Sequence, residues 1–286
     1  NPVSLESGTS HKMQLVTGPA NATDHRIKWT SSNKTAATVD ENGTVTALRP
    51  IETVTITAVY KPNPALTCSW NLKITRTKGY ITKQMLDNLD LTSIKKVMIT
   101  AHPDDETLWG GGHLIEGEYL VVCMTHGWNP KRRTAFEQTM RTTNDKYLIL
   151  DYPDVRKTFS NGKYETDMLS TCKNAMQEDI NLILSYKKWD LIATHNPFGE
   201  YGKFLHKTIS QMVTQCYNKM TNKSATLYYF GRYYNSSNKI PGEQIAPELL
   251  AIKNSMVGRY YPTAKGAIDA FGHMIPYENW LLPSEW

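Results

Sequence analysis

The chain has 286 residues, which is enough for about two domains and for a sizeable hydrophobic core. Lysine and arginine number 32 against 27 aspartates and glutamates, and the densest basic group, Lys131–Arg133, is too short for a nucleic-acid footprint. Hydrophobic residues make up 40% of the chain, but no run reaches the roughly 18 apolar residues of a membrane helix, so we expect neither a nucleic-acid partner nor a transmembrane segment.

The first part of the chain, to about residue 76, predicts an all-β domain. Short runs rich in valine, isoleucine and threonine alternate with turn residues, at 27–29, 37–39, 44–47, 53–59 and 70–74. Asn42-Gly43 lies between two of these runs and predicts a hairpin with a type I′ turn, which needs positive φ at both central residues. The alternation in Thr53–Val59 is typical of a half-buried strand. We therefore expect a small β-sandwich.

Three segments of this part carry a family pattern: Trp29-Thr-Ser-Ser-Asn33, Ala37-Thr-Val-Asp-Glu-Asn-Gly-Thr-Val-Thr-Ala47 and Thr55-Ile-Thr-Ala58. They resemble the bacterial Ig-like domain of group 2, and the likeness covers about residues 3–75. We expect a first domain at 1–78 of this kind. The resemblance implies an accessory module of an extracellular or cell-surface protein, which positions a neighbouring domain rather than catalysing.

From residue 79 the pattern changes to strands that alternate with helices. Strand-like runs lie at 97–100, 119–125, 146–150, 190–194 and 226–230, and helix-like runs at 82–89, 106–116, 131–144, 172–188, 204–218 and 245–256. Strands separated by helices predict βαβ units around a mostly parallel sheet with flanking helices. The second domain, 79–286, is therefore expected to be α/β.

The stretch His102-Pro-Asp-Asp-Glu106 follows an apolar strand and opens a helix with three glycines. Active sites of open α/β sheets form at the carboxyl ends of strands. His102 and Asp105 lie three residues apart across the turn, so they can converge on one metal ion while Asp104 points elsewhere. Alternatively, the acids only cap the helix, which is worth about 0.3–1 kcal/mol each. A cap leaves His102 and the glycines unexplained, which favours a site.

A second polar, glycine-rich stretch follows another apolar run and opens a helix: Thr194-His-Asn-Pro-Phe-Gly-Glu-Tyr-Gly-Lys-Phe-Leu-His206. Two such loops at strand ends can face each other across one crevice. His102, Asp105 and His206 then form a set of two nitrogens and one oxygen that leaves a fourth tetrahedral position open, as in catalytic zinc sites. His195 either orients a ligand or is a polar loop residue.

The chain thus contains two motifs, Ala101-His-Pro-Asp-Asp-Glu106 with Gly111-Gly112, and Gly199-Glu-Tyr-Gly202 with His206. Together they resemble the PIG-L/LmbE family of zinc N-deacetylases over about residues 94–280. The resemblance implies a Rossmann-like fold and removal of the acetyl group from N-acetylglucosamine-type sugars or glycoconjugates. By motif position, His102, Asp105 and His206 would bind zinc, and Asp104 would be the general base for zinc-bound water. Zinc lowers the pKa of its water to about 7, which suits amide hydrolysis.

One position departs from the family pattern Gly-His-Pro-x-His, because this chain reads Gly202-Lys-Phe-Leu-His206. Lys203 stands where the family has a histidine linked to oxyanion stabilisation or proton delivery. A lysine can stabilise an oxyanion by its charge, but it is a poor proton shuttle near neutral pH unless its pKa is lowered. Tyr201 matches a tyrosine near the substrate carbonyl and is the other candidate donor.

For four weaker candidates, the sequence leaves open whether the side chain lines the cleft or has a structural role. They are His126 and Trp128 after a strand, Trp109 after the first motif, and Arg133, which with Glu137 predicts a salt-bridged helix face but alternatively contacts a sugar hydroxyl.

We therefore expect a secreted or surface-attached amidohydrolase of linear amides. Its partner is an N-acetylated saccharide or glycoconjugate, with cell-wall or surface glycans among the targets. The ligand set also accepts other divalent metals such as Fe²⁺ or Co²⁺. Two alternatives stay open: a glycan-binding or adhesin protein with an impaired deacetylase domain, which Lys203 motivates, and a non-haem iron oxygenase, whose facial triad has the same ligand types. No basic and apolar leader opens the chain, so a signal peptide is not expected in this sequence.

Overall fold

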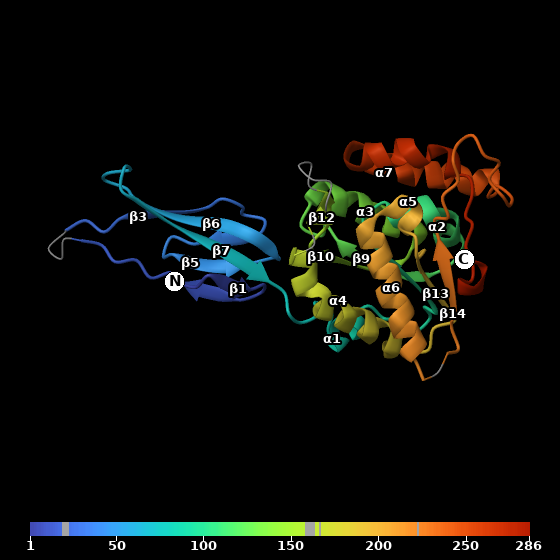
Figure 1. Ribbon diagram of the computed structural model, residues 1–286, viewed down its shortest axis with the longest axis horizontal. Helices are drawn as coiled ribbons and strands as arrows, with labels where there is room; N and C mark the ends of the chain where they lie inside the picture. The colour runs from blue at the N-terminus through green and yellow to red at the C-terminus, as the bar shows by residue number, and fades with distance from the viewer. Residues whose placement is uncertain (19–22, 158–163, 166, 222) are drawn as a thin grey trace. The chain divides into compact units, whose positions relative to one another are not determined.

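The computed structural model describes residues 1–18, 23–157, 164–165, 167–221 and 223–286. The chain divides into two compact units, Asn1–Lys78 together with Glu165–Ala175, and Gly79–Tyr164 together with Met176–Trp286. Figure 1 shows strands throughout the first part of the chain and a mixture of helices and strands in the second.

The strands of the first unit form two sheets. One has the order β1 (Ser4–Glu6), β7 (Thr67–Thr75), β6 (Ile51–Tyr60), β3 (Ile27–Ser31), and the other β2 (Ser10–Lys12), β5 (Thr44–Ala47), β4 (Ala37–Val39). Val54 and Ile56 of β6 are buried in one core with Val45 of β5 and Leu72 of β7, and the threonines between them face outward. The β-rich prediction and the alternation in 53–59 are confirmed.

The β4–β5 hairpin differs from the predicted type I′ turn. Its connection has four residues, 40–43, and Gly43 is the one with a positive φ, at 79°. The Asp40 carboxylate closes the loop by accepting from the backbone N–H of Asn42, at 2.9 Å, and of Thr44, at 2.7 Å. A Cβ on Gly43 would lie 2.7 Å from the Trp29 indole. The side chain of Asp40 therefore replaces the two-residue turn geometry.

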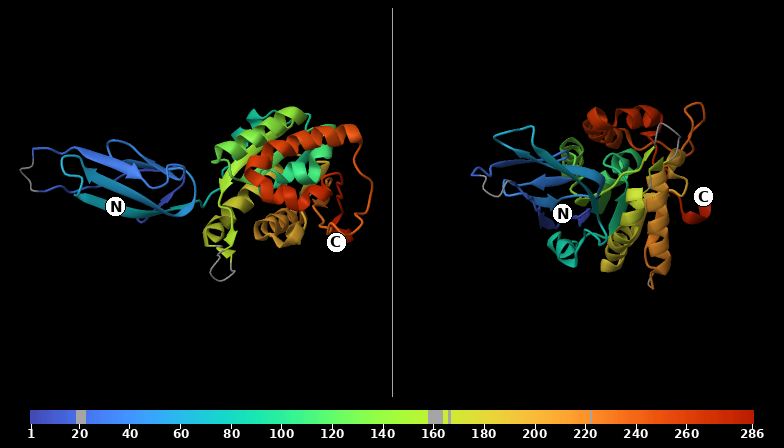
Figure 2. Two further views of the ribbon diagram at one scale, coloured as in Figure 1. Left: turned by 90° about the horizontal axis from the view of Figure 1, so that it is seen from above. Right: turned by 60° about the vertical axis from the view of Figure 1, so that its left-hand side comes forward.

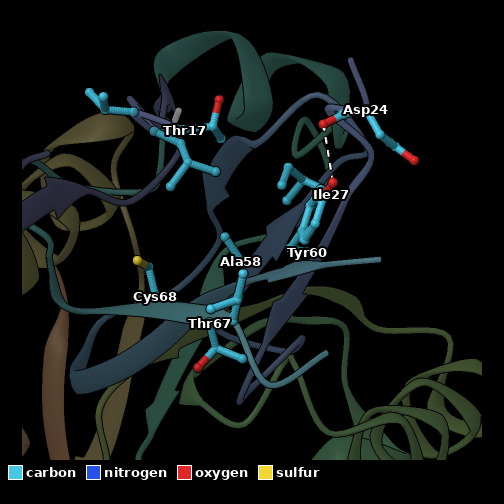
Figure 3. Close-up of a pocket in the computed structure, with 11 residues that line it drawn as sticks. Thr17, Asp24, Ile27, Ala58, Tyr60, Thr67 and Cys68 are labelled. Atoms are coloured by element: carbon cyan, nitrogen blue, oxygen red, sulfur yellow. Dashed lines mark hydrogen bonds between the residues drawn. The ribbon is translucent and has the colours of Figure 1, made fainter. Parts of the chain in front are cut away.

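A cavity of about 410 Å³ lies in the first unit (Figure 3). Ile27, Ala58, Thr67 and Cys68 line it, and the Tyr60 hydroxyl at its edge donates to the Asp24 carbonyl at 3.4 Å. No histidine is among the described residues that line this cavity. The described lining therefore does not contain the pairs of histidine and aspartate that the sequence predicts for the second half of the chain.

The second unit is built on a parallel sheet of order β10 (Lys146–Tyr152), β9 (Tyr119–Thr125), β8 (Lys96–Thr100), β13 (Leu191–His195), β14 (Thr226–Phe230). All seven residues of β9 are buried, as expected of a strand covered on both faces. The mixed α/β prediction with a parallel sheet is confirmed. Because β8 and β13 are neighbours, the two strands that precede the motifs end side by side.

Seven α-helices have described bounds: α1 (Lys83–Asn88), α2 (Asp105–Glu116), α3 (Pro130–Thr143), α4 (Asp167–Tyr186), α5 (Gly199–Gly202), α6 (Phe204–Lys219) and α7 (Pro247–Phe271). Two short strands, β11 (Arg156–Lys157) and β12 (Tyr164–Glu165), pair with each other, and 3₁₀ turns lie at Gly272–Met274 and Pro283–Glu285. Helices α2 and α3 both contact α7, which lies along the top of Figure 1 and in front in the left view of Figure 2. Among the described residues, no helix is both long and apolar enough to cross a membrane.

Helix α7 extends well beyond the predicted 245–256. It continues past Pro262 with a local kink at Ala264, where φ is −129°. Tyr260, Ala264, Ile268 and Phe271 recur every three or four residues and are buried in the core. Their burial outweighs the helix-breaking effect of the proline, and the sequence interpretation ended the helix too early.

The three glycines of α2 make room for side chains that pack against the helix. A Cβ on Gly110 would lie 2.9 Å from the Trp280 ring, one on Gly111 2.8 Å from Lys253 Cγ, and one on Gly112 3.1 Å from a Glu278 carboxylate oxygen. The helix is kinked at Gly110, where φ is −148°. In the sequence these glycines count in favour of a site, whereas the structure gives them a packing role.

Candidate functional site

The carboxyl ends of β8 and β13 hold the two sequence motifs next to each other. His102 follows β8, Asp105 is the first residue of α2, and His206 lies in the first turn of α6. All three side chains are buried. Parallel neighbouring strands end at the same edge of the sheet, which is why residues about 100 positions apart meet here.

The three side chains point donor atoms at one another. His102 Nδ1 lies 2.9 Å from His206 Nε2, and each of these nitrogens lies 3.4 Å from Asp105 Oδ2. In a tetrahedral zinc site with bonds of about 2.0–2.1 Å, the ligand atoms lie about 3.3 Å apart. Two imidazole nitrogens and a carboxylate oxygen at this spacing therefore fit a zinc ion, and the same donor types suit Fe²⁺ or Co²⁺.

Each of the two imidazoles contacts a carboxylate through the ring nitrogen that is not directed at the other candidate ligands. Asp154 Oδ1 lies 3.0 Å from His102 Nε2, and Glu200 Oε2 contacts His206 Nδ1. An ionised carboxylate only accepts hydrogen bonds, so the facing nitrogens carry hydrogen and leave Nδ1 of His102 and Nε2 of His206 for a metal. Burial lowers the pKa of His102, but Asp154 and Asp105 outweigh it and raise that pKa to about 9, so a metal ion that binds Nδ1 has to displace a proton from this nitrogen.

Asp104 lies beside this set without belonging to it. It is buried, has a φ of 135°, and its side chain makes no capping hydrogen bond to α2, so the helix-cap alternative is wrong for this residue. Burial and the charge of Asp105 raise the pKa of the Asp104 carboxyl to about 7, against the opposing charge of Arg132. A carboxyl group that titrates near neutral pH is suited to act as a general base.

A cavity of about 260 Å³ opens in front of these residues. Its lining includes His102, Asp104, Arg132, Asp154, Tyr201, Lys203 and four residues of α7, namely Thr263, Ala264, Gly266 and Ala267. Burial lowers the pKa of Lys203, but the nearby acids, Asp105 first, outweigh it, so the net shift is upward. The charged form of Lys203 is therefore favoured, and a charged lysine is a poor proton shuttle near neutral pH. Tyr201 is half exposed, and its ring lies 5.8 Å from Lys203 Nζ.

Several cavity residues were missed by the sequence interpretation. Arg132 lines the cavity and donates to the Thr263 carbonyl at 3.1 Å, whereas Arg133 pairs with Glu137 at 2.9 Å as the salt-bridge prediction has it. Asp154 had a usable signal, because it follows the carboxyl end of β10 within two residues. The α7 residues that line the cavity had no such signal in the sequence.

The structure places one of the weaker candidates in the hydrophobic core and others near the site. The Trp109 ring is buried against Phe271, with centroids 4.9 Å apart, which is the core alternative. His126 Nε2 lies 3.9 Å from Asp154 Oδ2, and its ring stacks on Trp128 with centroids 6.2 Å apart. His195 is fully buried, and its Nδ1 lies 2.9 Å from Glu200 Oε1, which favours the ligand-orienting role.

Solved structures similar to this chain include the conserved protein TT1542 from Thermus thermophilus, with a TM-score of 0.47 and 13% identity over 66% of this chain and 95% of that one. A GH10 xylanase from termite gut that contains a bacterial Ig-like domain aligns with 95% of this chain and 68% of that one, with a TM-score of 0.22 and 14% identity.

Two relatives align with part of the chain, and a family match covers its start. "Uncharacterized protein CA_P0160" of Clostridium acetobutylicum is 33% identical over 97 residues, which is 34% of this chain and 10% of that protein. "Uncharacterized protein L374" of Acanthamoeba polyphaga mimivirus is 31% identical over 175 residues, which is 55% of this chain and 67% of that protein. Residues 1–69 match the bacterial Ig-like domain of group 2, so the resemblance of the N-terminal part is confirmed. The chain carries this domain and belongs to the same protein family as the mimivirus protein.

Proposed function

We propose that the second unit is a zinc-dependent N-deacetylase of the PIG-L/LmbE type, which removes the acetyl group from an N-acetylated amino sugar or glycoconjugate. The observation that carries the proposal is the meeting of His102 Nδ1, Asp105 Oδ2 and His206 Nε2 within 3.4 Å of one another, beside the buried Asp104. These are the donor types and spacing of a zinc site with a free carboxylate at hand.

The strand order supports a Rossmann-like interpretation of the second unit. Along the chain the order runs outward from β8 through β9 to β10, and then from β13 to β14 on the other side of β8. In doubly wound sheets of this order, ligands bind where the direction reverses, which here lies between β8 and β13. The candidate ligands follow these two strands.

The candidate ligands and three polar residues of the cavity can divide the steps of amide hydrolysis among them. A zinc ion bound by His102, Asp105 and His206 would lower the pKa of a coordinated water to about 7 and polarise the acetamide carbonyl. Asp104 accepts the proton of the attacking water and returns it to the leaving amine, so acetate and a free amine result. Lys203, which stays protonated, stabilises the negative charge that develops on the carbonyl oxygen, with the Tyr201 hydroxyl as a second donor.

The cavity suits one sugar unit. Its volume of about 260 Å³ is just below the ~300–1,000 Å³ of pockets for drug-sized ligands. Arg132 donates and Asp154 accepts hydrogen bonds, and sugar hydroxyls need both kinds of partner. Together with the Ig-like domain, this polar lining supports a saccharide substrate and an extracellular or cell-surface location, with the domain as an accessory module.

Acetate release tests the proposal. Zinc-loaded protein is incubated with N-acetylglucosamine, its oligomers and N-acetylated glycoconjugates, beside protein treated with a chelator. We expect release from at least one of them, lost on chelation and restored by zinc. One zinc bound per chain without acetate release would favour the glycan-binding alternative. Iron-dependent oxygen consumption would favour the oxygenase.

Lys203→Met is expected to lower the turnover number about 10²-fold, because it removes the positive charge at the developing oxyanion and keeps the length of the side chain. Zinc content should stay the same. The matched control is Lys219→Met, which removes an exposed lysine at the other end of the same helix, α6. Steady-state kinetics of acetate release measure the effect. Equal turnover in both variants would mean that Lys203 does not face the carbonyl.

A further inference from the structure

We propose that Glu200 is a positioning residue, which fixes the two loops that carry the metal ligands relative to each other. One of its carboxylate oxygens contacts the ligand His206, and the other is linked through His195 to the backbone before the ligand His102. The inference rests on the metal centre of the proposed function and assigns a role that the two sequence motifs did not predict.

The first link fixes which nitrogen of His206 is free for a metal. Glu200 Oε2 contacts His206 Nδ1, and both side chains are buried. An ionised carboxylate accepts and does not donate, so the hydrogen of the neutral imidazole sits on Nδ1. The lone pair is then on Nε2, the atom that lies 3.4 Å from Asp105 Oδ2.

The second link reaches the other motif. Glu200 Oε1 lies 2.9 Å from His195 Nδ1, and the opposite ring nitrogen, Nε2, accepts the backbone N–H of Ala101 at 2.9 Å. Ala101 directly precedes His102, so His195 braces the start of the loop that carries the first ligand. His195 is fully buried at the end of β13. One carboxylate thus joins the loop after β8 to the loop and helix after β13.

The backbone around Glu200 is shaped to bring its carboxylate inward. Glu200 is buried with a φ of 56°, a conformation that costs a non-glycine residue free energy. A Cβ on Gly231 would lie 2.8 Å from Glu200 Cγ and Oε1, so a glycine after β14 is what leaves room for the carboxylate. Asn196 donates to the carbonyls of Phe230 and Gly231, at 3.0 and 2.9 Å, and fixes that segment. Three separate features therefore serve the placement of one side chain.

Metal affinity and cobalt spectroscopy test this role without a substrate. In Glu200→Gln the side chain keeps its shape but offers one acceptor oxygen for two imidazoles. We expect Zn²⁺ to bind 10–100-fold more weakly, as measured by competition with a chromophoric chelator. The absorption bands of bound Co²⁺ should lose intensity and shift, because the ligand His206 is no longer held in one orientation. The control is Asp145→Asn, which alters another buried carboxylate, one that contacts the Tyr119 backbone N–H and the Thr143 hydroxyl and no candidate ligand. It should bind both metals like the wild type.

The outcomes separate this inference from the proposed function. If the wild type binds Zn²⁺ and Glu200→Gln binds it equally tightly with an unchanged cobalt spectrum, Glu200 is not a positioning residue, and the proposed function stands. A wild-type protein that binds neither metal overturns both. If Glu200→Gln does not fold, Gly231→Ala takes its place, because its methyl group displaces the carboxylate without removing it. An unchanged affinity in a folded Gly231→Ala protein would likewise contradict the inference.

Discussion

Replacement of Asp104 by asparagine is expected to lower the turnover number for acetate release about 10²–10⁴-fold, the range that a positioned general base contributes. Asparagine has nearly the same shape, so the substrate and zinc should bind as before. The amide cannot accept a proton from water, so the loss falls on the chemical step. Steady-state kinetics together with the zinc content of the variant measure both quantities.

The structure gives three reasons for expecting the loss at this aspartate and not at its neighbour. Asp105 points at His102 and His206, as a ligand should, whereas Asp104 lines the cavity. Asp104 does not cap α2, so its removal breaks no helix-terminal hydrogen bond. Its φ of 135° is a costly backbone conformation, and such strain at a cleft residue is typical of a functional position.

A control for the backbone conformation is Asp90→Asn. Asp90 also has a positive φ, of 49°, but it is exposed and is not among the residues that line the cavity. We expect wild-type turnover from it. Full turnover in Asp104→Asn would exclude Asp104 as the base, and a protein that loses zinc as well as turnover would make Asp104 a ligand instead.

The sequence was most informative where chemistry and local structure coincide. The run His102 to Glu106 joins an apolar strand to a helix, so the residue types and the strand end both indicate the same place, and the structure brings His102 and Asp105 together there. His206 could be paired with them because its own stretch also follows an apolar strand. The parallel arrangement of β8 and β13 then brings the two loops together.

The features that the sequence did not predict depend on contacts between residues that lie far apart along the chain. Arg132 and Arg133 are about 100° apart around α3, and only the packing of that helix decides that Arg132 faces the cavity. Asp154 and Glu200 matter because of the imidazoles they face, which come from other strands and helices. In the sequence, the glycines of α2 favour a site over a helix cap, but their partners, Lys253, Glu278 and Trp280, lie more than 130 residues further on.

These partners of α2 support a second prediction. Replacement of Lys253 by methionine is expected to lower the free energy of unfolding by about 3–5 kcal/mol at pH 7, because it leaves a buried carboxylate without its cation. Lys253 is fully buried in α7, and its Nζ lies 2.7 Å from Glu278 Oε1. Urea unfolding followed by tryptophan fluorescence and by far-UV circular dichroism measures the loss.

The carboxylate of Glu278 also completes the second part of α2. The kink at Gly110 interrupts the helix, and the backbone N–H groups just after it lie at the start of the second part. Glu278 accepts from Gly112 N at 2.6 Å and from His113 N at 3.0 Å. A negative charge is favourable at such a helix start, and Lys253 balances that charge in the interior. Loss of the lysine is therefore expected to weaken the contacts between the C-terminal segment and α2.

The pH dependence distinguishes this cause from a simple loss of packing. Burial raises the pKa of Glu278, but Lys253 and His113 outweigh it and lower it from 4.5 to about 2. A lowered pKa stabilises the folded state above the unfolded-state pKa, and this stability is lost as the pH falls from about 4.5 towards 2. Lys253→Met removes the main cause of the shift, so the difference in stability between variant and wild type should shrink over the same range. In Lys253→Met/Glu278→Gln both charges of the pair are removed, and part of the stability should return at pH 7. A difference that stays constant down to pH 2, with no recovery in the double variant, would mean that the methionine is merely a poor fit.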